Sequence, residues 1–201
     1  SSFHSTALCP DRSWMATGCS DKHIRLFAVP GTVDDGDEVS EEARLQLLVA
    51  DAGGVMSVAW DPTEEWLASG HSDGSIRLWS AAALKEAAAV RTNATEVSPL
   101  LVLTSHSRLV RSVSWSRDGV WLASGGDDRT ACLWTAADLQ RAASEGESSA
   151  APRHMLQSHV SVVFCTLWHN ENQWLASGSY DRTVRLWPID ELEAGGGESG
   201  G

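Results

Sequence analysis

Basic residues are scarce in this chain of 201 residues. Only 15 lysines and arginines stand against 27 aspartates and glutamates, which gives a formal net charge of −12. So few cations are a poor match for the phosphate backbone of nucleic acids, and we expect no nucleic-acid partner. A long apolar run and a signal peptide are also missing, so we expect no membrane contact. These absences indicate a reducing compartment, the cytoplasm, with the nucleus as a second location.

Motifs that build metal and catalytic sites are absent as well. The sequence has no Cys-x-x-Cys pair, no His-x-x-x-His spacing and no Gly-x-x-x-x-Gly-Lys phosphate loop. We therefore predict no enzymatic activity, no metal and no cofactor. Four cysteines are predicted to be free thiols in buried or half-buried positions, with a disulfide or a metal as the alternative: Cys9, Cys19, Cys132 and Cys165.

Tryptophan, by contrast, is abundant and regularly placed. All ten tryptophans fall into three columns whose rows are 52, 55 and 53 residues apart. The columns are Leu8/Trp60/Trp115/Trp168, Trp14/Trp66/Trp121/Trp174 and Phe27/Trp79/Trp134/Trp187. Two more columns keep the same register, an acidic one (Asp21, Asp73, Asp128, Asp181) and a hydroxylated one (Thr17, Ser69, Ser124, Ser177). A fixed period of this length indicates an array of structural repeats.

Each repeat unit is predicted to hold short β-strands. In the third unit, alternation over 110–116, the turn signal Asp118-Gly119 and β-formers over 121–125 and 130–135 indicate three strands. A fourth strand is predicted at 45–49 and 100–103, and at 154–157. The predicted units are 1–50 with an N-terminal truncation, 51–104, 105–157, and 158–190 without an outer strand, followed by a flexible tail at 191–201.

The connections between units carry little chemistry of their own. Residues 82–89 are predicted to form a short helical turn. Six carboxylates lie between Asp34 and Glu42, which we interpret as a solvated loop, with a calcium site or a basic partner as the alternative.

Further motifs carry a family resemblance. Ser105-His106 and Ser158-His159 precede the Asp and Trp columns at equal distances, Leu-Ala-Ser-Gly precedes the corner, and third strands read Ile-Arg-Leu-Trp. In these features the chain resembles the WD40 repeat. The resemblance implies an all-β fold, a WD40 β-propeller with four visible blades whose first strands line the inside. We expect a partial or open ring, either a piece of a longer propeller or half of a ring completed elsewhere.

The resemblance also implies a buried network in each blade. An Asp is expected to bond a His, which bonds a Ser that accepts from the Trp indole. Two units have all four members: His106, Ser124, Asp128 and Trp134, and His159, Ser177, Asp181 and Trp187. Unit two has Asp51 at the His position, and unit one has Phe27 in place of Trp, so both networks are predicted to be broken. A hydrolase triad is the rejected alternative, because the set recurs in register with the structural repeat.

WD40 proteins resembling this chain are non-catalytic interaction scaffolds in multi-subunit complexes, so we expect protein partners. The partner-binding rim is predicted at the corner residues and the entrances to the first strands: Ser72, Arg108, Arg111, Asp127, Phe164 and Tyr180, with Ser20 in the first unit. Tyr180 is the foremost candidate, because Tyr is favoured at interface centres.

Two finer assignments remain open. The order of motifs over 109–115, 155–159, 167–169 and 179–187 is similar to the WD40 subunit of cytosolic iron–sulfur protein assembly, although Asp127 departs from the Arg typical there. A substrate receptor of a cullin-type ubiquitin ligase is the alternative. Such receptors carry Trp-Asp-x-Arg after the third strand, where this chain has Trp followed by Ser80, Thr135 or Pro188.

Overall fold

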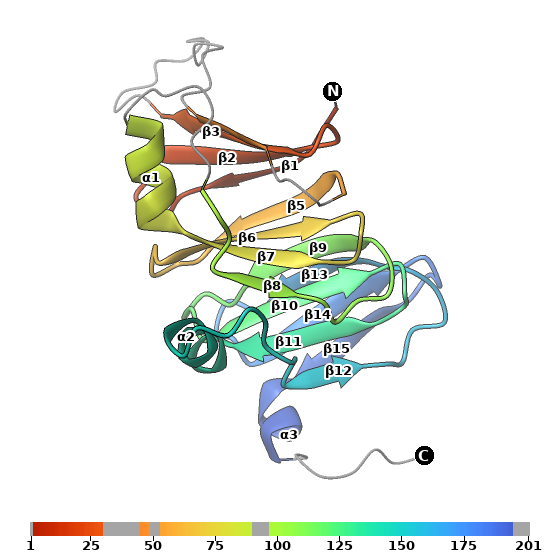
Figure 1. Cartoon of the computed structure of the whole chain (residues 1–201). Helices are drawn as coiled ribbons and strands as arrows, with labels where there is room; N and C mark the ends of the chain where they lie inside the picture. Colours follow the sequence, from red (N-terminus) through yellow and green to blue (C-terminus); the bar gives the residue numbers. More distant parts are fainter. Residues whose placement is uncertain (1, 30–44, 49–52, 90–96, 195–201) are drawn as a thin grey trace.

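Four antiparallel sheets follow one another along the chain (Figure 1). The computed structural model describes residues 2–29, 45–48, 53–89 and 97–194. Blade one consists of β1 (Phe3–Leu8), β2 (Trp14–Cys19), β3 (His23–Ala28) and β4 (Leu45–Leu48). Blade two consists of β5 (Val55–Trp60), β6 (Trp66–His71), β7 (Ile76–Ser80) and β8 (Leu101–Leu103).

The second half of the chain repeats this order. Blade three consists of β9 (Val110–Trp115), β10 (Trp121–Gly126), β11 (Ala131–Thr135) and β12 (His154–Leu156). Blade four has three strands among the described residues, β13 (Val163–Trp168), β14 (Trp174–Ser179) and β15 (Val184–Pro188). Three helices follow the third strands of blades two, three and four: α1 (Ala81–Ala89), α2 (Ala136–Ser144) and α3 (Ile189–Ala194). The first strands β1, β5, β9 and β13 lie next to one another.

Each first strand carries one extra residue, which interrupts its register with the second strand. The interruption falls between Phe3 and Ser5, between Val55 and Ser57, between Val110 and Ser112, and between Val163 and Cys165. The bulged residues are therefore His4, Met56, Arg111 and Phe164. A β-bulge re-aims a side chain away from the alternation of the strand, here at the edge where the corner between the second and third strands also lies.

Neighbouring blades interlock through a valine and a glycine. Val55, Val110 and Val163 open their first strands and are fully buried. Each presses on a glycine of the preceding blade, where an added Cβ would lie 2.8, 2.7 and 2.6 Å from the valine Cγ1 at Gly18, Gly70 and Gly125. Only glycine allows so close an approach, which explains why this position is glycine in every blade.

A hydrogen bond from a backbone N–H to a serine hydroxyl repeats at the same three interfaces. The backbone N–H of Val58 donates to the Ser5 hydroxyl, that of Val113 to the Ser57 hydroxyl and that of Thr166 to the Ser112 hydroxyl, each at 3.1 Å. Donors and acceptors occupy one column each, so the interface between blades is a repeating unit in its own right.

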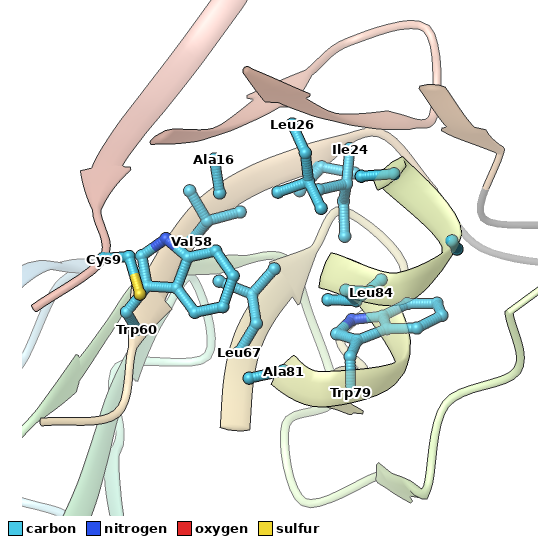
Figure 2. Close-up of a cluster of buried hydrophobic side chains, with 13 residues drawn as sticks. Cys9, Ala16, Ile24, Leu26, Val58, Trp60, Leu67, Trp79, Ala81 and Leu84 are labelled. Carbon is cyan, nitrogen blue, oxygen red and sulfur yellow. The ribbon is translucent and has the colours of Figure 1, made fainter. Parts of the chain in front are cut away.

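The apolar core lies between blades rather than inside them, because each blade buries its faces against its neighbours. Figure 2 shows Ile24 and Leu26 of blade one opposite Leu67 and Trp79 of blade two, with Leu84 of α1 covering the cluster. All five are at most 1% exposed. The helix expected at 82–89 is thus α1, and it seals the outer end of the first interface.

Several expectations need correction. Residues 136–144 lie in a connection for which no helix was predicted, and they form α2. Thr135 caps the first turn of this helix, because its Oγ1 accepts a hydrogen bond from the Asp138 backbone N–H. Residues 191–194 of the predicted flexible tail belong to α3. Cys165 is exposed, whereas the other three cysteines are buried and all four are free. The acidic segment at 34–42 lies outside the described residues. Among the helices of the described chain, none has the length and apolar character to cross a membrane.

Candidate functional site

Blade three contains a buried chain of hydrogen bonds. The His106 Nδ1 lies 3.0 Å from both carboxylate oxygens of Asp128, and its Nε2 lies 2.7 Å from the Ser124 hydroxyl. Burial alone lowers the pKa of His106, but the hydrogen bond to the Asp128 carboxylate and the interaction with Cys132 together outweigh burial and raise the pKa to about 9. Burial likewise acts to raise the pKa of Asp128, whereas His106 and Thr130 lower it to about 2. Near neutral pH the two side chains therefore form an ion pair.

The predicted fourth member of this chain makes another bond. The indole N–H of Trp134 donates to the backbone carbonyl of Ala150 at 3.3 Å, and the structure contains no bond from it to Ser124. Ala150 follows α2 and lies in the connection to β12, so Trp134 fixes that connection instead of completing the network. The sequence gives no signal for this bond, because a carbonyl is present at every residue.

Blade four contains the whole predicted chain. The Nδ1 of His159 lies 2.8 Å from Asp181, its Nε2 lies 2.8 Å from the Ser177 hydroxyl, and Trp187 donates to that hydroxyl at 2.9 Å. Hydrogen bonds from Thr183, followed by the one from His159, lower the pKa of Asp181 well below its usual value.

Blade two was expected to be broken, but it has a network of its own. Trp79 donates to the Ser69 hydroxyl at 2.9 Å, and that hydroxyl lies 2.8 Å from Nε2 of His71. His71 lies two residues after Ser69 on β6, so both side chains share one face of the strand. Its Nδ1 faces the Gly53 carbonyl at 3.5 Å instead of a carboxylate. Burial and the charge of Arg77 lower the pKa of His71 to about 4, so this imidazole is neutral.

Blade one replaces the network by an ion pair at its corner. The guanidinium of Arg25 binds both carboxylate oxygens of Asp21, at 3.2 and 2.7 Å. Thr17 has no imidazole beside it but lies 3.9 Å from the Cys19 sulfur. The Asp column is thus kept in all four blades, while its partner changes from arginine to serine to histidine.

These networks are not arranged for catalysis. The hydroxyls of Ser124 and Ser177 belong to residues that are 0% exposed, so a substrate has no access to them. Their lone pairs and protons are already engaged by histidine and, in blade four, by tryptophan. The arrangement satisfies buried polar groups that would otherwise destabilise the blades.

The rim where the corners meet the bulges presents a different kind of site. In blade three, the bulged Arg111 binds the corner residue Asp127 through two bonds of 2.6 and 3.1 Å. In blade four, the same two positions hold Phe164 and Tyr180, whose rings lie 5.3 Å apart at an angle of 32°. Phe164 is 50% and Tyr180 61% exposed. Asp127 and, more weakly, Tyr180 raise the pKa of Arg111, so the ion pair and the aromatic pair are neighbours.

The remaining predicted rim residues lie apart from these two pairs. Arg108 is exposed and precedes β9, where its backbone carbonyl approaches Gly74 of blade two. Ser72 is exposed at the blade-two corner, and its backbone N–H bonds the Gly54 carbonyl at 2.9 Å. Ser20 occupies the same position in blade one and accepts from the Ser2 backbone. The bulge and corner side chains that contact each other therefore lie on blades three and four.

One trio of metal-ligand types is found among the described residues. Atoms of Cys9, Asp11 and Glu64 lie within 4.8 Å of one another. The ammonium of Lys85 binds Asp11 at 2.9 Å and Glu64 at 3.0 Å, so a cation already occupies their centre. Burial raises the pKa of the Cys9 thiol to about 11, which keeps it protonated. These residues form ion pairs that link α1 to blade one, and this role suits the cluster better than metal binding.

Comparison with known proteins identifies the repeat. The family model described as WD domain, G-beta repeat, matches residues 2–27, 44–80, 97–135 and 150–188. The chain belongs to the WD40-repeat family. A solved structure, a chain of a mitotic checkpoint complex, superimposes with a TM-score of 0.69 at 19% identity over 94% of this chain and 50% of that one. At this identity the likeness shows the fold alone.

The chain is similar to parts of longer curated proteins. It is 26% identical to Protein HIR1 of Cryptococcus neoformans var. neoformans serotype D over 94% of this chain and 21% of that protein. It is also 26% identical to the chromatin assembly factor 1 subunit FAS2 homolog of Oryza sativa subsp. japonica, over 86% of this chain and 30% of that protein. The WD40 chain thus spans less than a third of each of these two proteins. Neither name refers to iron–sulfur assembly, so that expectation gains no support.

Proposed function

We propose that this WD40 chain is a non-catalytic protein-interaction scaffold that contacts protein partners through the rim of blades three and four. The observation that carries the proposal is the exposed aromatic pair of Phe164 and Tyr180 beside the Arg111–Asp127 ion pair. Aromatic and arginine side chains are the residues that dominate binding energy at protein interfaces. Blades one and two offer only Ser20 and Ser72 at the same corner position.

The rigidity of this rim supports the same function. The corner that holds Tyr180 also holds Asp181, which is fixed by His159 and Thr183, so the aromatic residue stands on an ordered turn. The Asp128 network fixes the blade-three corner in the same way. Side chains held in place before binding lose less conformational entropy when a partner docks.

Removal of the tyrosine side chain tests the proposal. We expect Tyr180→Ala to lower the recovery of partner proteins by at least about tenfold when the tagged chain is purified from cells and quantified by mass spectrometry. The matched control is Val120→Ala, because Val120 is 46% exposed in the turn at the opposite rim. Both variants should keep the circular dichroism spectrum of the wild type. Equal recovery by all three proteins contradicts the rim assignment.

The setting of this scaffold is a proposal of its own. Chromatin assembly factor in the name of one similar protein supports a subunit of a multi-protein assembly. We propose the cytoplasm, or alternatively the nucleus, as its location. The iron–sulfur assembly assignment rests only on the motifs of blades three and four. The same purification separates the finer assignments: cluster-carrier proteins favour iron–sulfur assembly, and cullin components favour a ubiquitin-ligase receptor.

A further inference from the structure

The corner rim, the end of the blades where the second strands turn into the third, carries one left-handed residue in each blade. These residues are Lys22 with a φ of 68°, Gly74 with 90°, Arg129 with 72° and Arg182 with 69°. The three that are not glycine are all cations, and all three are exposed. Lys22 and Arg129 are exposed although another blade follows each of them, so a neighbouring blade leaves this position open.

The turns between first and second strands give a comparison at the opposite rim. They hold residues of the same backbone conformation: Arg12 with a φ of 58°, Glu64 with 62°, Gly119 with 72° and Asn172 with 57°. One cation, one anion, one amide and one glycine occupy these four turns, so the conformation itself does not select a positive charge. Because this conformation is unfavourable for long side chains, three cations at the corner rim indicate that the charge has a use there.

The carboxylates of the corner rim on blades three and four are already paired. The side chains of Asp128 and Asp181 are 9% and 5% exposed, and each binds the buried histidine of its blade. Asp127 is bound by the guanidinium of Arg111. The exposed Arg129 and Arg182, by contrast, form no ion pair with any residue that the structure describes. The rim therefore offers two cations to a partner and withholds its anions.

Most other carboxylates lie at the far end of the blades. Apart from the corner aspartates and Asp127, those of the described residues lie in the turns between first and second strands, in the helices and in the connections beside them. Figure 1 shows the helices at the end of the blades opposite the corners. A chain with a net charge of −12 thus presents its unpaired cations at one rim. Such a separation of charge attracts an acidic partner to that rim and orients it.

A hollow of about 480 Å³ beside the blade-three corner supplies further hydrogen-bond donors. It is lined by Ser105, Ser107 and Arg129 among others. Hydroxyl and guanidinium groups both donate to carboxylates, and a guanidinium can do so through two parallel bonds. Asp128 also lines the hollow, but its charge is balanced by His106 and one of its oxygens accepts from the Ser107 backbone N–H. A carboxylate that enters the hollow therefore meets donors rather than a free anion.

We propose that the corner rim of blades three and four binds a segment of a partner protein that is rich in aspartate and glutamate. The inference rests on the proposed function, because the rings of Phe164 and Tyr180 are the apolar part of the same surface. Arg182 follows Tyr180 by two residues, and Arg129 occupies the same position at the blade-three corner. Carboxylates of the segment pair with these two arginines while its apolar side chains pack on the rings.

Charge reversal at the blade-three corner tests the proposal. The probe is a fluorescein-labelled peptide of alternating glutamate and glycine, and fluorescence anisotropy gives its dissociation constant for the full chain. We expect Arg129→Glu to raise this constant at least about tenfold. Arg12→Glu is the matched control, because it makes the same change of charge in the same backbone conformation at the opposite rim, and it should raise the constant less than about twofold. Arg129→Gly should also weaken binding, yet unfold near the temperature of the wild type, because glycine adopts this conformation freely.

Salt and the purified partners complete the test. Sodium chloride should weaken binding of the glutamate peptide, and the same peptide with lysine in place of glutamate should not bind. When the tagged chain is purified from cells, Arg129→Glu should lower the recovery of the proteins that Tyr180→Ala also loses, and phosphatase treatment should leave recovery unchanged.

The outcomes separate this inference from the proposed function. If recovery depends on Tyr180 but not on Arg129, the scaffold function stands and the acidic partner is wrong. A wild-type chain that does not bind the glutamate peptide, equal effects of Arg129→Glu and Arg12→Glu, or loss of the partners after phosphatase treatment overturns the proposal.

Discussion

At the scale of single residues, the blades use histidine in two charge states. His106 is buried beside Asp128 and is held as a cation, while His71 is buried beside a carbonyl and stays neutral. Both imidazoles bond the serine of the same column, so both satisfy one buried hydroxyl. The same structural need is therefore met with and without an ion pair, and the two solutions respond to pH in opposite directions.

Removal of the Asp-column carboxylate should destabilise blade three, where it belongs to a buried network, more than blade one, where it does not. We expect Asp128→Ala to lower the free energy of unfolding by about 3 kcal/mol, because it leaves the buried His106 and the Ser107 backbone N–H without their acceptor. Asp21→Ala, whose side chain is 30% exposed and binds Arg25, should cost less than about 1 kcal/mol. Urea unfolding followed by tryptophan fluorescence measures both. Equal losses in the free energy of unfolding would show that the buried network stabilises the chain no more than the ion pair of Asp21 and Arg25 does.

Acidification should destabilise blade two through His71. Its folded pKa of about 4 lies below the ordinary value of 6.5, so the unfolded chain takes up the proton first. The contribution of His71 to stability is complete above pH 6.5 and declines as the pH falls towards 4, by at most about 1.4 kcal/mol per pH unit. The stability deficit of His71→Gln relative to the wild type should therefore shrink over this range. A deficit that is constant with pH would mean that His71 is protonated in the folded state.

The linkage of His106 has the opposite sign. Its folded pKa of about 9 lies above 6.5, so its stabilisation is complete below pH 6.5 and declines as the pH rises towards 9. Together the two histidines place the most stable condition of blades two and three near pH 6.5.

At the scale of elements, the interlock of valine and glycine should control how blades join. Gly125→Ala would place a methyl group 2.6 Å from Val163 Cγ1, and we expect it to destabilise the chain by about 1–3 kcal/mol. The added substitution Val163→Ala should restore part of the loss, because it removes the clashing methyl groups. Gly178→Ala is the matched control, since the methyl group added there meets no valine and only the Cys165 sulfur, at 2.8 Å. Thermal unfolding compares them, and an equal loss for Gly125→Ala and Gly178→Ala would refute the interlock.

The strands of this array were largely predictable, because they follow from a period. The tryptophan columns and the alternation over 110–116 place β9 to β11 within a residue or two. The helices were harder to predict from the sequence, because the connections are rich in Ala and Ser and have no apolar period. Thr135, which caps α2, is nevertheless a local signal for a helix start. His71 was missed because the expected histidine was sought before the blade, whereas a position two residues from Ser69 shares its face. The bond from Trp134 to Ala150 depends on the path of a connection, which no column encodes.

At the scale of the whole molecule, charge and apolar surface act against each other. The net charge of −12 keeps copies apart, whereas blade one exposes Phe3 and Leu8 and blade four exposes Leu167, Val184 and Leu186. Repulsion between exposed charges is screened beyond about 8 Å at physiological salt and reaches about 30 Å at 0.01 M. The attraction between apolar faces does not weaken in this way. Salt should therefore shift the balance towards association.

We accordingly expect the weight-average mass from static light scattering to exceed the 21.6 kDa of one chain, and to rise with both protein concentration and sodium chloride. Leu186→Asp is the control, because it puts a charge in the middle of the exposed blade-four face and should suppress the rise at every salt concentration. If the mass remains that of a single chain as salt increases, the apolar attraction between the faces of blades one and four is weaker than the repulsion that remains after screening.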